Sequence, residues 1–302
     1  MDTTPPDNPA PLHHLTDPFP TPVGIDLWLK RDDLLHPQVS GNKWRKLKYN
    51  LIAARAGGFD TLLTFGGAFS NHLYATAAAG RLNSLKTIGI VRGDELAHQP
   101  LNPTLTFCRK AGMQLYFVSR AEYQRKDDPA FLTELRLRFG PFYHLPEGGT
   151  NTLAMRGTAE IMPEIVSQLG FSPDVVACAV GTGGTVAGLA QSASAQTQVL
   201  GFVALKIPEN ESFHLPITDN YSLVPDNCSL ISDYHFGGYA RTTPALLAFM
   251  AVFEQKTGIL IEPIYTAKLL FGLYDLARWG YFSLGARVVA VHTGGLQGRS
   301  VG

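Results

Sequence analysis

The sequence predicts an α/β protein in which mostly parallel sheets are covered by helices. Short apolar segments alternate with segments of helical periodicity from about residue 60 onward. The apolar segments are continuous instead of alternating with polar residues, which is typical of strands buried on both faces. Glycine or proline lies in the connections, where the chain has to turn. Together these three observations favour parallel sheets over an all-β or all-α fold.

The expected elements follow one another in regular order. The segments predicted to form strands are "DTLLTFGG" (60–67), "KTIGIVRG" (86–93), "QLYFVSR" (114–120), "DVVACAVG" (174–181), "QVLGFVAL" (198–205) and "ARVVAVHTGG" (286–295). The segments predicted to form helices are 71–82, 103–112, 129–140, 155–170 and 244–258. Ligands bind such sheets beyond the carboxyl ends of the strands, so a site is expected where a strand gives way to a helix.

The composition is that of a folded globular protein. The chain has 302 residues, 45% of them apolar and 17% charged, which is enough for two domains with large cores. Lysine plus arginine equals aspartate plus glutamate at 25 each, so no net charge attracts nucleic acid or an anionic membrane. The start resembles no signal peptide and no apolar run reaches membrane-spanning length, so we expect a soluble, cytoplasmic protein.

The cysteines and the longest irregular segment indicate no particular chemistry. Cys108, Cys178 and Cys228 lack the spacing of a disulfide framework or a zinc site, and we expect buried thiols. None of the histidines belongs to a metal-binding pattern. Residues 207–233 show no clear periodicity and form either a cover over a site or a long surface loop.

The stretch "SGNKWRKLKYN" at 40–50 contains four cations, and the position of Lys43 sets it apart from the others. We take Asn42 as a helix cap and Lys43 as the first helical residue. A projection at about 100° per residue then places the apolar side chains in one arc: Trp44, Leu47, Leu51 and Ala54. Lys43 lies nearest the centre of this arc, and the other cations are expected on a solvated face: Arg45, Lys46 and Lys48.

Lys43 would also lie at the positive end of the helix dipole. That position disfavours a charged ammonium by roughly 0.3–1 kcal/mol at an exposed site. A neutral amine or an imine is disfavoured less. Two interpretations therefore stay open: a lysine that does chemistry, and a lysine whose charged end reaches solvent from the helix terminus.

Two strand-to-helix junctions carry groups that bind anions. In "FGGAFSNH", Gly66 and Gly67 follow a strand, and Ser70-Asn71-His72 begin a helix whose exposed N–H groups suit a carboxylate. In "CAVGTGGTVAG", the N–H groups from Gly181 to Thr185 precede a helix expected to begin near Val186 and are able to surround a phosphate.

The glycine-rich junction excludes two common phosphate ligands. It lacks the lysine of a Walker loop, so a nucleotide triphosphatase is not expected. It also fails the dinucleotide pattern, because Val186 stands at the third glycine position and the next strand ends at Lys206 instead of an acid. A tight turn is the simple alternative. Combined with Lys43 and the Ser-Asn helix start, however, the loop provides the parts that hold pyridoxal phosphate.

These motifs identify a family resemblance. The sequence from "LWLKRDDLLHP" (27–37) to "VHTGG" (291–295) resembles the 1-aminocyclopropane-1-carboxylate deaminase/D-cysteine desulfhydrase family of pyridoxal-phosphate enzymes, which have the tryptophan-synthase-β-like fold called fold type II. The resemblance implies a large cofactor-binding domain (1–56 plus 153–302), a small domain (57–152), an active site between them, and a homodimer.

The resemblance also assigns roles to residues. By similarity to the family signature "SGNKWRKL", Lys43 is the Schiff-base residue. Ser70 and Asn71 bind or act on the substrate, and Asn71 also faces the cofactor ring. The phosphate loop corresponds to a run of five residues: Gly181, Thr182, Gly183, Gly184 and Thr185. The segments "FGGYARTTPAL" and "IEPIYTAK" supply the active-site tyrosines, Tyr239 and Tyr265.

Two positions depart from the deaminase pattern. The residue after the second tyrosine, near the pyridine nitrogen, is typically glutamate in deaminases and is Thr266 here. The residue after the histidine of the last motif is typically leucine there and is Thr293 here. A glutamate keeps the ring nitrogen protonated and the ring a strong electron sink, whereas a hydroxyl gives a weaker one. Opening a cyclopropane that has no α-hydrogen needs the stronger sink, so Thr266 favours desulfhydrase chemistry.

The expected reaction is elimination from a small amino acid. Its carboxylate would bind around Ser70 to His72, and Lys43 would take the α-proton, which requires a pKa below the ordinary value of about 10.4. Loss of the β-substituent then leads to a 2-oxo acid, ammonia and sulfide. Tyr265, ahead of Tyr239, would assist the leaving group, although core packing is an alternative for each. His72 would contribute through its backbone, and His292 is either functional or a buried strand-end residue.

Two other classes stay open on sequence alone. A nicotinamide-dependent oxidoreductase would use the glycine loop for a pyrophosphate, against the fingerprint mismatch. A non-catalytic small-molecule-binding protein would keep the loop without using the lysine. Visible absorption distinguishes the classes, because only a pyridoxal-phosphate protein is yellow. Within the family, the alternative to D-cysteine desulfhydrase is 1-aminocyclopropane-1-carboxylate deaminase.

Overall fold

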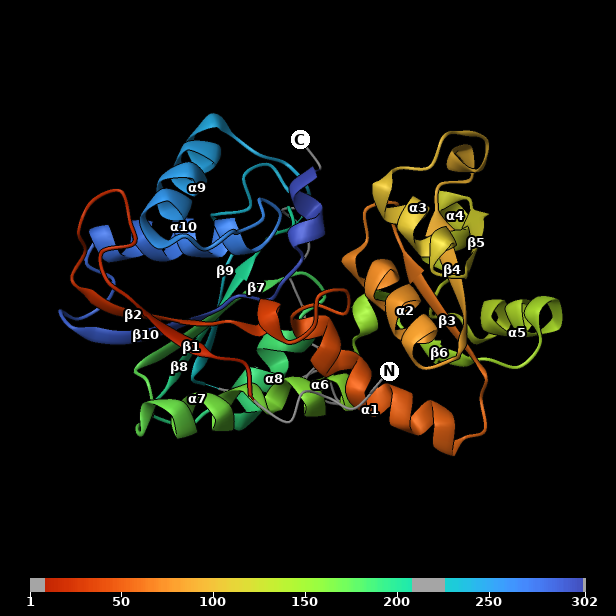
Figure 1. Ribbon diagram of the computed structural model, residues 1–302, viewed down its shortest axis with the longest axis horizontal. Helices are drawn as coiled ribbons and strands as arrows, with labels where there is room; N and C mark the ends of the chain where they lie inside the picture. The colour runs from red at the N-terminus through yellow and green to blue at the C-terminus, as the bar shows by residue number, and fades with distance from the viewer. Residues whose placement is uncertain (1–8, 208–225, 301–302) are drawn as a thin grey trace. The chain divides into compact units, whose positions relative to one another are not determined.

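The computed structural model describes residues 9–207 and 226–300 (Figure 1). Its strands are β1 (Leu12–Leu15), β2 (Ile25–Lys30), β3 (Thr61–Gly66), β4 (Lys86–Arg92), β5 (Met113–Val118), β6 (Tyr143–Leu145), β7 (Val175–Val180), β8 (Gln198–Val203), β9 (Cys228–Ile231) and β10 (Ala286–Val291). Its α-helices are α1 (Asn42–Ala56), α2 (Asn71–Leu82), α3 (Pro103–Lys110), α4 (Arg120–Gln124), α5 (Pro129–Phe139), α6 (Thr152–Ala159), α7 (Ile161–Leu169), α8 (Gly184–Ser192), α9 (Pro244–Thr257) and α10 (Thr266–Arg278).

The chain divides into two compact units. Among the described residues, unit 1 comprises His36–Val39 and Lys43–Gly157, and unit 2 comprises 9–35, Ser40–Asn42, 158–207 and 226–300. Helix α1 therefore groups with unit 1 from its second residue onward. The domain boundaries expected from the resemblance, and an active site between the domains, stay predictions.

Unit 2 is built on a six-stranded sheet in the order β1-β2-β10-β7-β8-β9. Every neighbouring pair is parallel except β1 with β2. Helices α9 and α10 cover one face and α7 and α8 the other (Figure 1). Alternate residues of β7, Val175, Ala177 and Ala179, enter the core beneath α9 and α10. All six residues of β7 are buried, because helices cover both faces.

Unit 1 is built on a four-stranded, fully parallel sheet in the order β5-β4-β3-β6. On one face, Leu63 and Phe65 of β3 pack in a core that includes Phe131 of α5. On the other face, Leu62 packs in a core shared with α1 and α2. The two parallel sheets with helices confirm the predicted α/β fold class.

All six predicted strands and all five predicted helical segments are present, with two changes at helix boundaries. The segment 155–170 contains the end of α6 and all of α7, because Pro163 has no N–H to continue a helix from α6 into α7. Helix α8 begins at Gly184 and not near Val186. Of the irregular segment 207–233, residues 208–225 lie outside the described residues, while 228–231 form β9.

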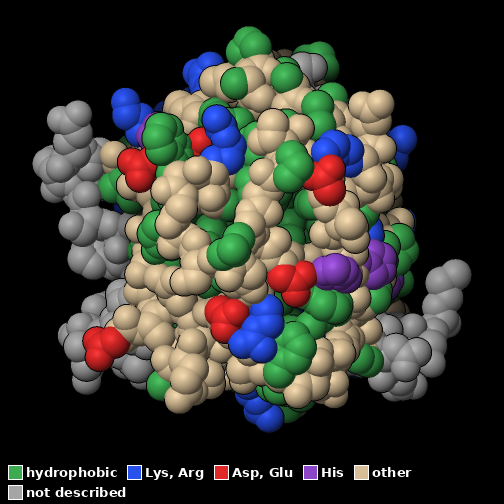
Figure 2. Space-filling view, turned by 90° about the vertical axis from the view of Figure 1, so that its left-hand side faces the viewer, with side chains coloured by type: hydrophobic (Ala, Val, Ile, Leu, Met, Phe, Trp, Pro, Cys, Tyr) green, Lys and Arg blue, Asp and Glu red, His purple; other side chains and the backbone are tan. Residues whose placement is uncertain are grey.

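The surface and the cysteines agree with the composition. On the face that Figure 2 shows, charged side chains of both signs are scattered among apolar and polar ones. All three cysteines are buried, as expected. Across residues 9–207 and 226–300, no helix combines the length and the apolar character needed to cross a membrane.

Candidate active site

Lys43 lies in the first turn of α1, on its apolar side. Leu47 and Ala54 are buried, and Trp44 and Leu51 pack against the same core, which confirms the predicted arc. Asn42 is the first residue of the helix instead of its cap. Loss of solvation lowers the pKa of Lys43 to about 8. An ammonium with this pKa releases its proton near neutral pH, as an amine that acts as nucleophile or base must.

The predicted solvated face of α1 is wrong for two of its three cations. Arg45 and Lys46 are only 3% and 2% exposed, and Lys48 is partly exposed. The ammonium of Lys46 donates to Gly148 O (3.1 Å) and Thr150 Oγ1 (2.9 Å). The helix projection fails here because a second segment covers α1: a Cβ at Gly157 of α6 would lie 2.0 Å from the carbonyl oxygen of Arg45.

Ser70 caps helix α2, at the position that the sequence predicts. Its Oγ accepts hydrogen bonds from the N–H groups of His72 and Leu73, each at 3.2 Å. Asn71 is the first residue of the helix. A Cβ at Gly66 would lie 2.7 Å from Ser70 Oγ, so the loop between β3 and α2 closes tightly only with glycine there. The Ser70 hydroxyl keeps its own proton for an acceptor such as a carboxylate.

His72 is buried, and only one of its two ring nitrogens has a hydrogen-bond partner among the described residues. Its Nε2 pairs with Thr64 Oγ1 at 2.9 Å, whereas its Nδ1 has no hydrogen-bond partner among the described residues. Burial, followed by the charges of Lys43 and Lys46, holds the pKa of His72 well below its usual value. The imidazole is therefore neutral, and Lys43, Ser70, Asn71 and His72 come together within unit 1. Thr64, inside a buried strand, gave no sequence signal for this contact.

The glycine-rich loop joins β7 to α8 in unit 2. Gly183 precedes the helix with a φ of 85°, a conformation that favours glycine, and no side chain caps the helix start. The amide of Asn42 donates to the buried Thr185 Oγ1 at 2.8 Å. Asn42, directly before Lys43 in the chain, is thus tied to the loop expected to hold the phosphate. Uncapped N–H groups at a helix start suit a phosphate.

The two tyrosines assigned by resemblance lie together in unit 2. The ring centroids of Tyr239 and Tyr265 are 6.2 Å apart, with an angle of 62° between the ring planes. A Cβ at Gly181 would lie 3.2 Å from the hydroxyl oxygen of Tyr265. Tyr265 therefore reaches the start of the glycine-rich loop. Tyr239 is more open to solvent, with 37% of the residue exposed.

Thr266 places a buried hydroxyl at the start of α10. The residue is fully buried, and its Oγ1 makes no hydrogen bond of acceptable geometry within residues 9–207 and 226–300. It is nevertheless near enough to Glu262 to favour the ionised carboxylate. Glu262 accepts the N–H groups of Ile264, Tyr265 and Thr266 at 2.7, 3.0 and 2.5 Å. Burial raises the pKa of Glu262 despite these bonds. Sequence reasoning missed Glu262.

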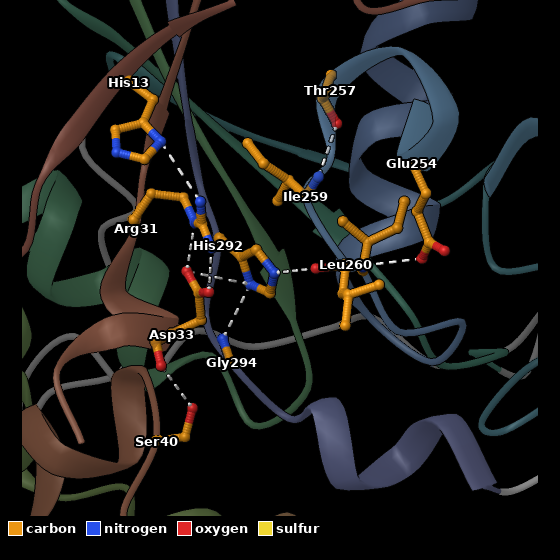
Figure 3. A network of polar contacts seen from close by, with 11 residues as sticks. His13, Arg31, Asp33, Ser40, Glu254, Thr257, Ile259, Leu260, His292 and Gly294 are labelled. Atoms are coloured by element: carbon orange, nitrogen blue, oxygen red, sulfur yellow. Dashed lines mark hydrogen bonds and ion pairs between the residues drawn. The ribbon is translucent and has the colours of Figure 1, made fainter. Parts of the chain in front are cut away.

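Thr293 and His292 follow strand β10. Thr293 is buried, and its carbonyl accepts the N–H of Asn42 at 3.2 Å. His292 is fully buried: its Nε2 bonds to Leu260 O (2.9 Å) and its Nδ1 accepts the N–H of Gly294 (3.2 Å). Figure 3 shows this ring beside Asp33, 3.9 Å from Nδ1. Burial lowers the pKa of His292, so the structure favours the buried strand-end interpretation.

The residues fit pyridoxal phosphate. The start of α8, which no side chain caps, suits its phosphate. The buried hydroxyl of Thr266, which makes no well-formed hydrogen bond in the described part of the chain, suits a neutral ring nitrogen. The lowered pKa of Lys43 suits covalent attachment of an aldehyde. In the described part of the chain, no group of three or more histidine, cysteine or acidic side chains is arranged to hold a metal ion.

Comparisons with known proteins identify relatives that match most of this chain. A protein of Pyrococcus horikoshii, provisionally named 1-aminocyclopropane-1-carboxylate deaminase, is 30% identical over 91% of this chain and 86% of its own. The bifunctional D-cysteine desulfhydrase/1-aminocyclopropane-1-carboxylate deaminase of Arabidopsis thaliana, a mitochondrial protein, is 30% identical over 96% of this chain and 77% of its own.

A solved structure shares the fold over almost the full length. It is described as a homologue of 1-aminocyclopropane-1-carboxylate deaminase, has a TM-score of 0.80 and 28% identity, and the match covers 96% of this chain and 90% of the other. Residues 3–294 match the family described as "Pyridoxal-phosphate dependent enzyme". From its sequence and its fold, this chain belongs to the family of pyridoxal-phosphate-dependent enzymes.

Proposed function

We propose that the protein is a pyridoxal-phosphate-dependent lyase of the D-cysteine desulfhydrase type. The reaction converts D-cysteine and water into pyruvate, ammonia and hydrogen sulfide. The observation that carries this proposal is the buried hydroxyl of Thr266, which makes no well-formed hydrogen bond among the described residues and stands where deaminases by resemblance have a carboxylate. A hydroxyl leaves the ring a weaker electron sink, which suffices for losing a thiolate beside an acidic α-carbon.

In the proposed reaction, each side chain of the site has a separate role. The Ser70 hydroxyl, at the start of α2 next to Asn71, binds the substrate carboxylate. Lys43, with a pKa near 8, takes the α-proton as a neutral amine. Bound pyridoxal phosphate supplies the sink for the electron pair released at the α-carbon. Tyr265, beside Gly181, gives a proton to the departing sulfur.

The cofactor would be held by the glycine-rich loop and by groups assigned through the family resemblance. The phosphate binds the N–H groups from Gly181 to Thr185, and Asn42 fixes Thr185 within that loop. Asn71 and Thr293 lie where the family places ring contacts by resemblance. A homodimer and a cytoplasmic location, both expected from the sequence, stay predictions, as does the absence of nucleic-acid and membrane partners.

A substrate comparison tests this proposal. We expect the purified protein, supplied with pyridoxal phosphate, to release sulfide and pyruvate from D-cysteine at a much higher kcat/KM than it releases 2-oxobutanoate from 1-aminocyclopropane-1-carboxylate. Colorimetric sulfide and coupled 2-oxo-acid assays follow the products. The reverse preference would make the protein a deaminase. Binding of the cofactor without turnover of either would favour a non-catalytic protein.

The role of Thr266 has its own matched pair of variants. Thr266→Val removes the hydroxyl and keeps the shape, and we expect about a tenfold loss of kcat/KM for D-cysteine, the effect of one hydrogen bond of roughly 1.4 kcal/mol. Thr76→Val is the control, because Thr76 also has a buried hydroxyl without a hydrogen-bond partner, in α2. Equal effects of both variants would remove Thr266 from the site.

A further inference from the structure

The loop that carries Tyr239 has an unusual backbone. Four of the five residues from 236 to 240 have positive φ: Phe236 (52°), Gly237 (93°), Gly238 (114°) and Ala240 (54°). Two of these are glycines, which adopt such angles readily, but Phe236 and Ala240 are not. A segment in this conformation persists only when its surroundings hold it in place.

The buried side chain of Lys268 holds this loop in place. The residue is 1% exposed and lies in the first turn of α10. Its ammonium donates to Gly238 O at 2.7 Å, to His235 O at 2.8 Å and to Ala204 O at 3.4 Å. The three hydrogens of the ammonium thus face three carbonyl oxygens, and two of those belong to the chain just before Tyr239.

The second tyrosine, Tyr265, is held by a residue that lies just before α10. Glu262 holds the N–H groups at the start of α10, including that of Tyr265. Burial lowers the pKa of Lys268 to about 8, although the nearby charge of Glu262 raises it in part and so stabilises the ammonium. The side chains of Lys268 and Glu262, near the start of α10, are therefore bonded to the backbone close to each of the two tyrosines.

We propose that Lys268 is a positioning residue: its ammonium clamps the 235–240 loop and so keeps the ring of Tyr239 against that of Tyr265. The proposal rests on the proposed function for its effect on turnover. The clamp itself is a property of the chain and is measurable without substrate or cofactor.

Amide hydrogen exchange of the protein without cofactor tests the clamp. In Lys268→Met, which keeps the apolar stem and removes the donors, we expect amides of 235–240 to exchange at least about tenfold faster, with Lys268→Arg restoring much of the protection. Lys30→Met is the matched control, because Lys30 is also a fully buried lysine bonded to a backbone carbonyl, that of Ala10. Unchanged exchange in Lys268→Met, or the same change at 235–240 in Lys30→Met, would overturn the proposal.

A double-mutant cycle tests the link to Tyr239. We expect Lys268→Met and Tyr239→Phe each to lower kcat for D-cysteine by about tenfold, with cofactor absorbance retained. The double variant should lose little more than either single variant, because both changes act through the hydroxyl that the Tyr239 ring carries. If the fold-losses of the two single variants multiply in the double variant, Lys268 does not act through Tyr239. If the wild-type protein does not turn over D-cysteine, the proposed function fails while the exchange result still decides the clamp.

Discussion

Lys43→Ala is expected to abolish turnover, with a loss of at least about 10³-fold in kcat. A positioned acid or base contributes roughly 10²–10⁴-fold by itself, and this variant also removes the amine to which the cofactor attaches. The fold should remain, because Lys43 is not part of a described apolar core. Turnover of D-cysteine and the visible absorbance of the purified protein measure the effect.

The control for this variant lies on the same helix. Lys48 is partly exposed and sits 5.1 Å over the ring of Tyr49. Lys48→Ala should keep both the colour and most of the activity. Equal losses in the two variants would point to damage of α1 in general, and full activity in Lys43→Ala would remove the lysine from the mechanism.

Gly41→Ala is expected to destabilise the protein by about 2–5 kcal/mol. The added Cβ would lie 1.8 Å from Thr293 O, and Gly41 has a φ of +64°, which L-residues adopt at a cost of roughly 1–2 kcal/mol. Overpacking adds roughly 1–3 kcal/mol. Because the next residue, Asn42, bonds both Thr293 O and Thr185, the same change should also weaken cofactor binding. Chemical denaturation gives the free energy of unfolding.

A variant at Gly58 separates the cost of the positive φ from the cost of overpacking. It has a similar φ of +71°, but no atom lies within 4 Å of a Cβ built there. Gly58→Ala should therefore cost only about 1–2 kcal/mol, the conformational part of the effect. If both variants lose the same stability, the close approach between Gly41 and Thr293 contributes nothing.

The strands and helices that the sequence predicts well are those buried on both faces. Strand β7, for example, is continuously apolar, and this pattern is visible in the sequence whatever side chains pack against it. The strands that were missed are short or lie toward sheet edges: β1, β2, β6 and β9. Strand β2 illustrates the reason, since Asp26 and Lys30 interrupt its apolar residues. Lys30 is nevertheless fully buried, because it pairs with Glu164 at 2.8 Å.

In the candidate site, too, the sequence predicts some residues and misses others. Motifs with a local cause were predictable, such as the Ser70 cap and the glycine-rich turn before α8. Residues that act through backbone atoms distant in the sequence were not. Glu262 and Lys268 read as ordinary charges, and their burial follows only from the carbonyl and N–H groups that the fold brings to them.

The site of covalent attachment tests the central claim most directly. The protein is saturated with pyridoxal phosphate, reduced with borohydride, digested and analysed by mass spectrometry. We predict one stoichiometric pyridoxyl group on Lys43, and none on its buried neighbour Lys46 or on Lys268. A modification at another lysine, or none at all, would contradict the account.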